Sequence, residues 1–139
     1  MTRHEDRRVL LDSMAVLAGF TCDLAAVGLP DGSRPDVLRA DLSGRRLFIG
    51  DAKDVETPGN AATGARLGRY MSWGAGAASC GLEVVVAICH GRPAESWRWV
   101  ETLVAALRVQ GGQLGICDVA TLDPSLAIAC LTLHPVGVR

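Results

Sequence analysis

The sequence predicts a single α/β domain over residues 1–139, with a central mixed β-sheet flanked by helices. Helical and strand-like patterns follow one another in the order α, β, β, β, α, β, α, β, β, an alternation typical of a sheet covered by helices. Residues 82–89 are almost continuously apolar and β-branched, as expected of a central strand. The chain has 139 residues, of which 49% are apolar, which is enough for one substantial core.

The amino-terminal half is expected to hold one helix and three strands. Apolar residues recur every three to four positions over residues 5–18, and Gly19 follows as a carboxyl cap. Three strand-like runs come next. A Pro-Asp-Gly turn separates the first two runs, and a short Ser-Gly connection makes a hairpin of the last two. The predicted strands are residues 20–27, 36–42 and 46–52.

The carboxyl-terminal half is expected to hold two helices and three strands. Residues 60–79 have helical length, and Gly64 and Gly68 lie on one face, where they would let the helix approach the sheet closely. The strand at 82–89 precedes the clearest helix, residues 93–110. The apolar stripe expected to pack on the sheet is formed by Trp97, Val100, Val104 and Leu107. Residues 113–120 and 126–133 complete the predicted sheet.

Composition excludes several classes of protein. No run reaches the roughly 18 apolar residues of a membrane span, and no apolar signal segment follows the charged amino terminus. We therefore expect a cytoplasmic protein without a membrane association. The net charge of −1 gives no global basic field. The five cysteines are odd in number and lack a CxxC spacing, which favours reduced thiols over disulfides or a zinc site.

A small group of charged residues falls at predicted strand ends. Asp36 opens the second strand, and Asp51 and Lys53 end the third. Residues two apart in a strand point to the same face, so Asp51 and Lys53 project together. In the predicted hairpin, Asp36 starts one strand where Asp51 ends its neighbour. Lys53 is the only lysine among the 14 basic residues of the chain. Two carboxylates and an ammonium group should therefore meet at one edge of the sheet.

Two neighbouring carboxylates repel each other unless a cation shares their site. Oxygen ligands and open water positions suit Mg²⁺, for which Mn²⁺ can substitute. Asp36 and Asp51 would bind the metal together with the backbone carbonyl of Ala52, and Lys53 would orient or deprotonate a water molecule. This arrangement is typical of metal-dependent hydrolysis of phosphodiesters.

Arg34-Pro35-Asp36 followed by Asp51-Ala52-Lys53 resembles the motif of the PD-(D/E)xK nuclease superfamily. The resemblance covers roughly residues 5–90 and implies the restriction-endonuclease-like αβββαβ core and an endonuclease activity on nucleic acid, most often DNA. It also implies a glutamate on the first helix that completes the metal site, for which Glu5 is the best match and Asp12 the substitute.

Many superfamily members carry a QxxxY element on the helix after the lysine strand, where this chain has RxxxY from Arg66 to Tyr70. Arginine and tyrosine near a metal suit phosphate contacts, so Arg66, Arg69 and Tyr70 are the candidate nucleic-acid-binding residues. Small resolvases of the superfamily form homodimers, and here the apolar carboxyl-terminal strand and the tryptophan-bearing helix offer surfaces for one.

Other interpretations remain open at this point. The neutral net charge also suits a catalytically silent nuclease-fold module that acts in protein or nucleic-acid assembly. Asp51 and Lys53 could form an ordinary ion pair at a strand end. Finally, Cys89 and His90 follow each other at the end of a central strand, as a thiol-dependent enzyme would require.

Overall fold

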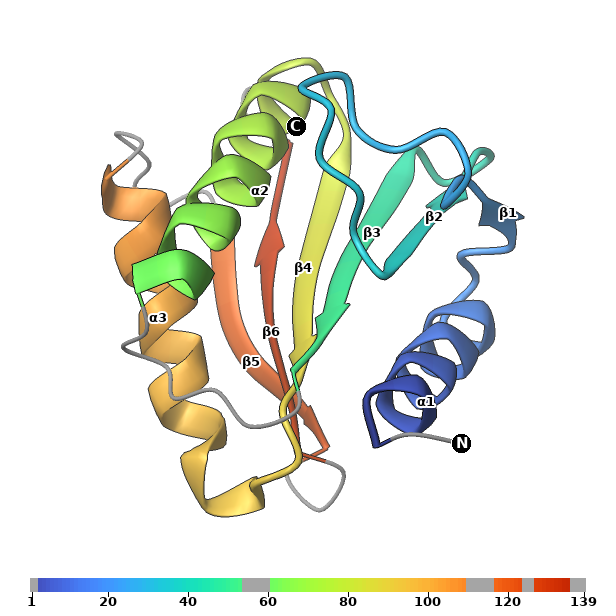
Figure 1. Ribbon diagram of the computed structural model, residues 1–139. Coiled ribbons are helices and arrows are strands. Elements are labelled where there is room, and N and C mark those ends of the chain that lie inside the picture. Colours follow the sequence, from blue (N-terminus) through green and yellow to red (C-terminus); the bar gives the residue numbers. More distant parts are fainter. Residues whose placement is uncertain (1–2, 54–60, 110–116, 124–126, 136–139) are drawn as a thin grey trace.

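The computed structural model describes residues 3–53, 61–109, 117–123 and 127–135. A six-stranded mixed sheet in the order β1-β2-β3-β4-β6-β5 lies between α1 on one face and α2 and α3 on the other (Figure 1). This confirms the predicted α/β class and the predicted order of elements. The elements are α1 Arg3–Leu17, β1 Cys22–Asp23, β2 Val37–Asp41, β3 Arg46–Ala52, α2 Ala61–Ser79, β4 Glu83–Cys89, the 3₁₀ turn η1 Pro93–Glu95, α3 Ser96–Val109, β5 Cys117–Asp123 and β6 Ile128–Leu133.

The strand pairing brings the carboxyl ends of β3 and β4 together at one edge of the sheet, the edge formed by strand ends. β2 and β3 form an antiparallel hairpin in which Val37 pairs with Gly50. β3 and β4 run parallel, which requires the crossover that α2 provides. β6 pairs antiparallel with β4 and with β5. The last residues of β3 and β4 therefore lie at the edge to which the first turn of α1 also points (Figure 1).

Alternation along the strands divides the buried residues between two cores. Phe48 of β3 packs with Leu11 and Phe20 on the α1 side. Its neighbours Leu47 and Ile49 pack on the opposite side against α2 and α3, where Tyr70 and Trp99 are fully buried. Because β3 alternates in this way, Asp51 and Lys53 must point toward α2.

Several details of the elements differ from the prediction. β1 has only two residues instead of the predicted run over 20–27, because the chain after Leu24 turns: the amides of Val27 and Gly28 both donate to the Leu24 carbonyl. β5 starts at Cys117, and the predicted strand start at residue 113 lies outside the described residues. No helix among the described residues has the length and apolar character needed to cross a membrane.

The predicted inward faces of α2 and α3 also differ from those in the structure. On α3 the side chains of Trp99 and Leu103 are fully buried, whereas Trp97 is 61% exposed, so the buried stripe is rotated from the predicted one. On α2 the close approach to the sheet is at Gly74, where an added Cβ would lie 3.0 Å from Leu133. At Gly64 an added Cβ would meet nothing within 4 Å. Both errors arise because a helical period alone leaves the facing stripe ambiguous by one position.

Candidate functional site at the β2–β3 edge

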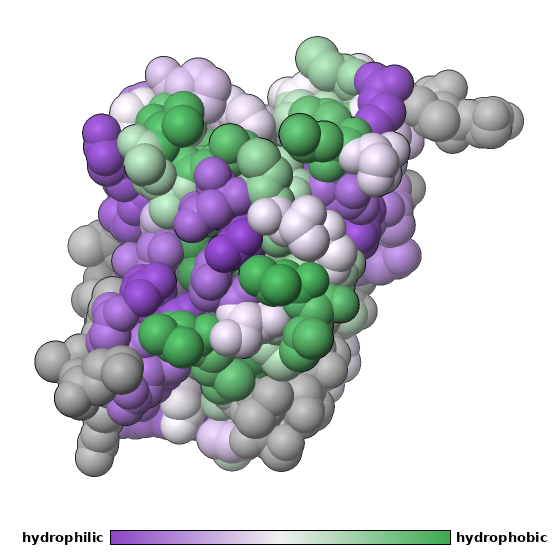
Figure 2. All heavy atoms as spheres, turned by 90° about the vertical axis from the view of Figure 1, so that its right-hand side faces the viewer, coloured by the Kyte–Doolittle hydropathy of each residue, from purple (hydrophilic) through white to green (hydrophobic). Residues whose placement is uncertain are grey.

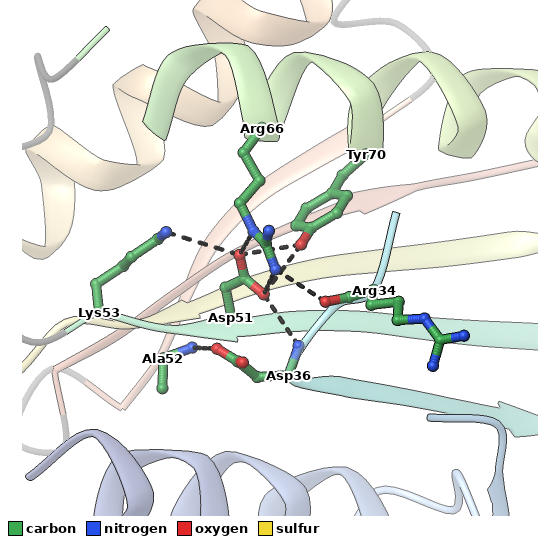
Figure 3. A network of polar contacts seen from close by, with 7 residues as sticks. All are labelled: Arg34, Asp36, Asp51, Ala52, Lys53, Arg66 and Tyr70. Carbon is green, nitrogen blue, oxygen red and sulfur yellow. Dashed lines mark hydrogen bonds and ion pairs between the residues drawn. The ribbon is translucent and has the colours of Figure 1, made fainter. Parts of the chain in front are cut away.

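Asp36 and Asp51 lie opposite each other at the open end of the β2–β3 hairpin, as the strand pattern predicts. Each carboxylate accepts a hydrogen bond from the neighbouring strand's backbone. The Asp36 amide donates to Asp51 Oδ1 at 3.1 Å, and the Ala52 amide donates to Asp36 Oδ2 at 2.9 Å (Figure 3). These reciprocal bonds continue the ladder beyond Val37 and fix both side chains to the sheet edge.

The carboxylate of Asp51 is the centre of the site. Asp51 is 1% exposed, and three side chains surround its carboxylate with positively charged or hydrogen-bond-donor groups (Figure 3). Arg66 Nε lies 2.5 Å from Oδ2, and Arg66 Nη2 lies 3.4 Å from Oδ1. The Tyr70 hydroxyl is 3.0 Å from both oxygens, and Lys53 Nζ is 3.8 Å from Oδ2. A buried carboxylate is tolerated only when paired and hydrogen-bonded in this manner.

The protonation states of the partners follow from this arrangement. The hydrogen bond from the Arg66 guanidinium to Asp51 is the main cause that raises the pKa of Arg66, so Arg66 stays charged. Burial, with a smaller contribution from the negative charge of Asp51, raises the pKa of Tyr70. Tyr70 therefore remains a neutral phenol that donates its hydrogen to Asp51.

Two neighbouring segments support the site from outside. Arg66 also donates from Nη2 to the backbone carbonyl of Arg34, at 2.9 Å, which ties α2 to the loop before β2. On the α1 side, Arg7 Nη1 donates to the carbonyl of Lys53. Gly91, with φ of +83°, leaves the space that the Arg7 guanidinium fills. Arg7 and Arg66 thus approach the same strand end from opposite faces of the sheet.

The predicted third metal ligand needs correction. Glu5 is paired with Arg8, whose Nε lies 3.0 Å from Glu5 Oε2, and the part of the chain that the structure describes holds no group of three Asp, Glu, His or Cys side chains placed to bind a metal ion. The predicted third metal ligand is therefore not in the cluster, and its substitute Asp12 binds Arg39 at 2.6 Å instead.

The nucleic-acid-binding prediction also changes for the RxxxY element. Tyr70 has no exposed surface and donates to Asp51, so it positions the carboxylate and cannot touch a polynucleotide. Arg66 holds the same carboxylate. Only Arg69 is exposed in the way that a phosphate contact requires. The sequence signal was present, since Arg66 and Tyr70 are four apart on one helix face, but it did not say that this face turns inward to Asp51.

The donors at this edge fit Mg²⁺ in their chemistry. Mg²⁺ is commonly bound through one or two carboxylates together with waters, and Asp36 and Asp51 supply two on adjacent strands. The carbonyl of Ala52, between Asp51 and Lys53 in the chain, remains a predicted third oxygen. The fit carries one condition: the oxygens of Asp51 already accept from Arg66 and Tyr70, so a cation has to displace one of them.

The structure argues against chemistry at Cys89 and His90. Cys89 is 1% exposed, and burial raises the pKa of its thiol, which is the opposite of what a thiolate nucleophile needs. Burial lowers the pKa of His90 to about 4, so its ring is neutral. The ring accepts from the Arg92 amide at Nδ1 and lies 3.1 Å from Ser96 Oγ at Nε2. These contacts make His90 a structural residue beside the site.

Comparison of the sequence with protein-family models and with curated proteins, and of the structure with solved structures, gave no match.

Proposed function

We propose that this protein is a Mg²⁺-dependent nuclease that hydrolyses phosphodiester bonds in DNA. The observation that carries the proposal is that Asp36 and Asp51, which are 15 residues apart in the chain, meet at one edge of the sheet, where Lys53 also pairs with Asp51. The order α1, β1, β2, β3, α2, β4 is also that of the PD-(D/E)xK superfamily core, which we propose for this chain. The free thiols suit the reducing cytoplasm, where we propose it acts.

The side chains divide the work of hydrolysis between them. Asp36 and Asp51, with the Ala52 carbonyl, would hold Mg²⁺. The ion supplies neutralisation of charge at the scissile phosphate and acidification of a water molecule. Lys53, 13% exposed at its side chain and 3.8 Å from Asp51, would orient the attacking water through a hydrogen bond from its ammonium group. Tyr70 would keep Asp51 in a single orientation.

Basic side chains from three elements favour a polyanionic substrate at this edge. Arg7 comes from α1, Lys53 follows β3, and Arg66 lies on α2. The side of the molecule over α1 is different: Figure 2 shows hydrophobic residues interspersed with hydrophilic ones there, and Leu17 is 85% exposed. We therefore place the phosphate backbone at the strand ends. Backbone contacts of this kind carry no base readout.

A cleavage assay tests the proposal. Purified protein is incubated with supercoiled plasmid and with single-stranded DNA in Mg²⁺, Mn²⁺ or EDTA, and the same is done for Asp51→Asn, Lys53→Met and the charge-conserving Lys53→Arg. Loss of a supporting contact at a metal site costs about 10–100-fold, so we expect Asp51→Asn to lose at least that much. Asp118→Asn, at a 77% exposed side chain on β5, is the matched control. Cleavage that survives unchanged in Asp51→Asn contradicts the proposal.

The second candidate is a catalytically silent nuclease-fold module. The observation that favours it is the charge balance around Asp51, whose single carboxylate already pairs with both Arg66 and Lys53. This candidate predicts that the protein binds DNA in a gel-shift assay equally with EDTA and with Mg²⁺, and that no cleavage occurs in either. The nuclease predicts cleavage with the metal.

A further inference from the structure

Arg66 holds the position at Asp51 that a divalent cation requires. A carboxylate offers about four lone-pair positions on its two oxygens. At Asp51 these accept from the Asp36 amide, from the Tyr70 hydroxyl and from two nitrogens of Arg66. A cation that binds Asp51 must therefore replace a donor that is already in place.

The three donors differ in how easily they can leave. The Asp36 amide is part of the backbone beside a hairpin ladder. Tyr70 is packed in the core with no exposed surface. The Arg66 side chain is 33% exposed and reaches Asp51 from the solvent side of α2, between the carboxylate and the Arg34 carbonyl. Arg66 is thus the one that can swing out without disturbing the core.

We infer that Arg66 is a competing counter-ion, which keeps the affinity of this site for divalent cations low until its guanidinium moves away from Asp51. The inference rests on the proposed function and adds a means of regulation to it. A phosphate group of DNA is a natural acceptor for the displaced guanidinium, because arginine binds phosphate with the same two-nitrogen geometry with which it binds carboxylate.

This exchange couples the binding of metal to the binding of DNA. A phosphate that attracts Arg66 releases Asp51 for the cation, and a cation on Asp51 releases Arg66 for the phosphate. Since such coupling is reciprocal, each ligand raises the affinity for the other. The site would then load metal in the presence of substrate, and free Mg²⁺ would bind weakly.

Binding of Mn²⁺, measured by electron paramagnetic resonance in the absence of DNA, tests the inference independently of activity. Arg66→Gln keeps a polar side chain but removes the charge, and we expect it to bind Mn²⁺ at least ~10-fold more tightly than the wild type, because a nearby cation no longer opposes the metal. Arg66→Lys keeps the positive charge that opposes the metal, so it should bind Mn²⁺ within about threefold of the wild type. Arg98→Gln, at a 70% exposed side chain on α3, is the control and should leave the affinity unchanged. Adding Asp51→Asn to Arg66→Gln should abolish the gain.

The outcomes separate this inference from the proposed function. If Arg66→Gln binds Mn²⁺ no more tightly than the wild type, the competition is refuted, even when the wild type cleaves DNA. If it binds more tightly while no variant cleaves, the competition stands and the nuclease function fails. Arg66→Gln leaves Asp51 without its main partner, so thermal unfolding is followed as well. Should the variant be unfolded alone, recovery of the folded state on addition of Mn²⁺ supports the inference, and no recovery refutes it.

Discussion

Tyr70 donates its hydroxyl hydrogen to the Asp51 carboxylate from a fully buried side chain, at 3.0 Å from each oxygen. The bond joins the middle of α2 to the last residues of β3. It also fixes the carboxylate from the core side, while Arg66 and Lys53 approach it from the solvent side. Asp51 is therefore held in one orientation whichever cation lies in front of it.

Tyr70→Phe tests this positioning role. The variant removes one hydrogen bond to a charged group, so we expect a loss of about 1.5–3 kcal/mol in the free energy of unfolding, measured by urea denaturation. If Tyr70 served stability alone, the affinity for Mn²⁺ would not change. If Tyr70 positions Asp51, the variant should also bind Mn²⁺ more weakly, by a factor of about 10. Unchanged Mn²⁺ affinity in a folded variant would show that Asp51 needs no such support.

Substitution of glycine by alanine is expected to have opposite effects on stability at two positions. Gly50 of β3 faces α1, and a Cβ there would lie 2.7 Å from Leu11 Cδ2 and 2.9 Å from Phe48 Cε1. We expect Gly50→Ala to cost about 1–3 kcal/mol of stability through overpacking. Gly64→Ala adds a methyl group to a helix where nothing lies within 4 Å, so it should stabilise by up to about 1 kcal/mol. Chemical denaturation of both variants checks the pair, and equal effects would contradict the packing of α1 on β3.

His90 gives a pH dependence with a defined sign. Burial lowers its folded-state pKa to about 4 from 6.5; the negative charge of Glu95 opposes this shift and the positive charge of Arg7 adds to it. Below pH 6.5 the unfolded chain binds a proton that the folded chain does not, so stability is full above that pH and falls as the pH drops toward 4. The loss amounts to about 3 kcal/mol at 1.36 kcal/mol per pH unit. His90→Gln should lose less stability than the wild type over this range in urea denaturation. Parallel pH profiles of the two proteins would refute the assignment.

The outer face of α3 carries an acidic and a basic side chain at positions that would pair in a homodimer. Glu101 and Arg108 are both exposed and lie two helical turns apart on one face, with Val104 and Ala105 between them. In an antiparallel pair of α3 helices with a two-fold axis between positions 104 and 105, each Glu101 faces the Arg108 of the other copy. The exposed Trp97 and Val109 would be covered at the ends of such an interface. We therefore propose that a second copy of this chain packs against the outer face of α3.

Charge reversal provides a selective test of this dimer. Glu101→Arg alone and Arg108→Glu alone each place like charges opposite each other, so each variant should be monomeric by analytical ultracentrifugation at concentrations where the wild type dimerises. Mixing the two variants restores both opposite-charge pairs and should give a heterodimer. Arg98→Glu, a 70% exposed side chain on the same helix, is the control. A monomeric wild type, or single variants that still dimerise, would end the proposal.

Much of the architecture could be predicted from local patterns. β3 and β4 are continuous apolar runs, and their ends coincide with the predicted ones at Ala52 and Cys89. The two-residue period placed Asp51 and Lys53 on one face, and the short β2–β3 connection placed Asp36 beside them. These predictions succeeded because each depends on geometry over a few neighbouring residues, which tertiary packing does not alter.

The remainder depends on contacts between distant elements. Which face of α3 is buried follows from how the helix docks on β6 and β5, so Trp97 and Trp99 could not be told apart by spacing alone. Glu5 was assigned to the site from its position on the first helix, but Arg8, one turn away, captures its carboxylate. The inward turn of Arg66 likewise depends on the rotation of α2 about its axis, which the sequence leaves undetermined.

The polar network around Asp51 comes from one short stretch of the chain. Its hydrogen bonds join residues 15 apart for Asp36 and Asp51, 15 for Asp51 and Arg66, and 19 for Asp51 and Tyr70. The entropy lost on closing a loop grows with its length, so these contacts are cheaper to form than the pairing of Ala87 with Cys130. We therefore expect these contacts around Asp51 to form early in folding, before the last two strands join the sheet.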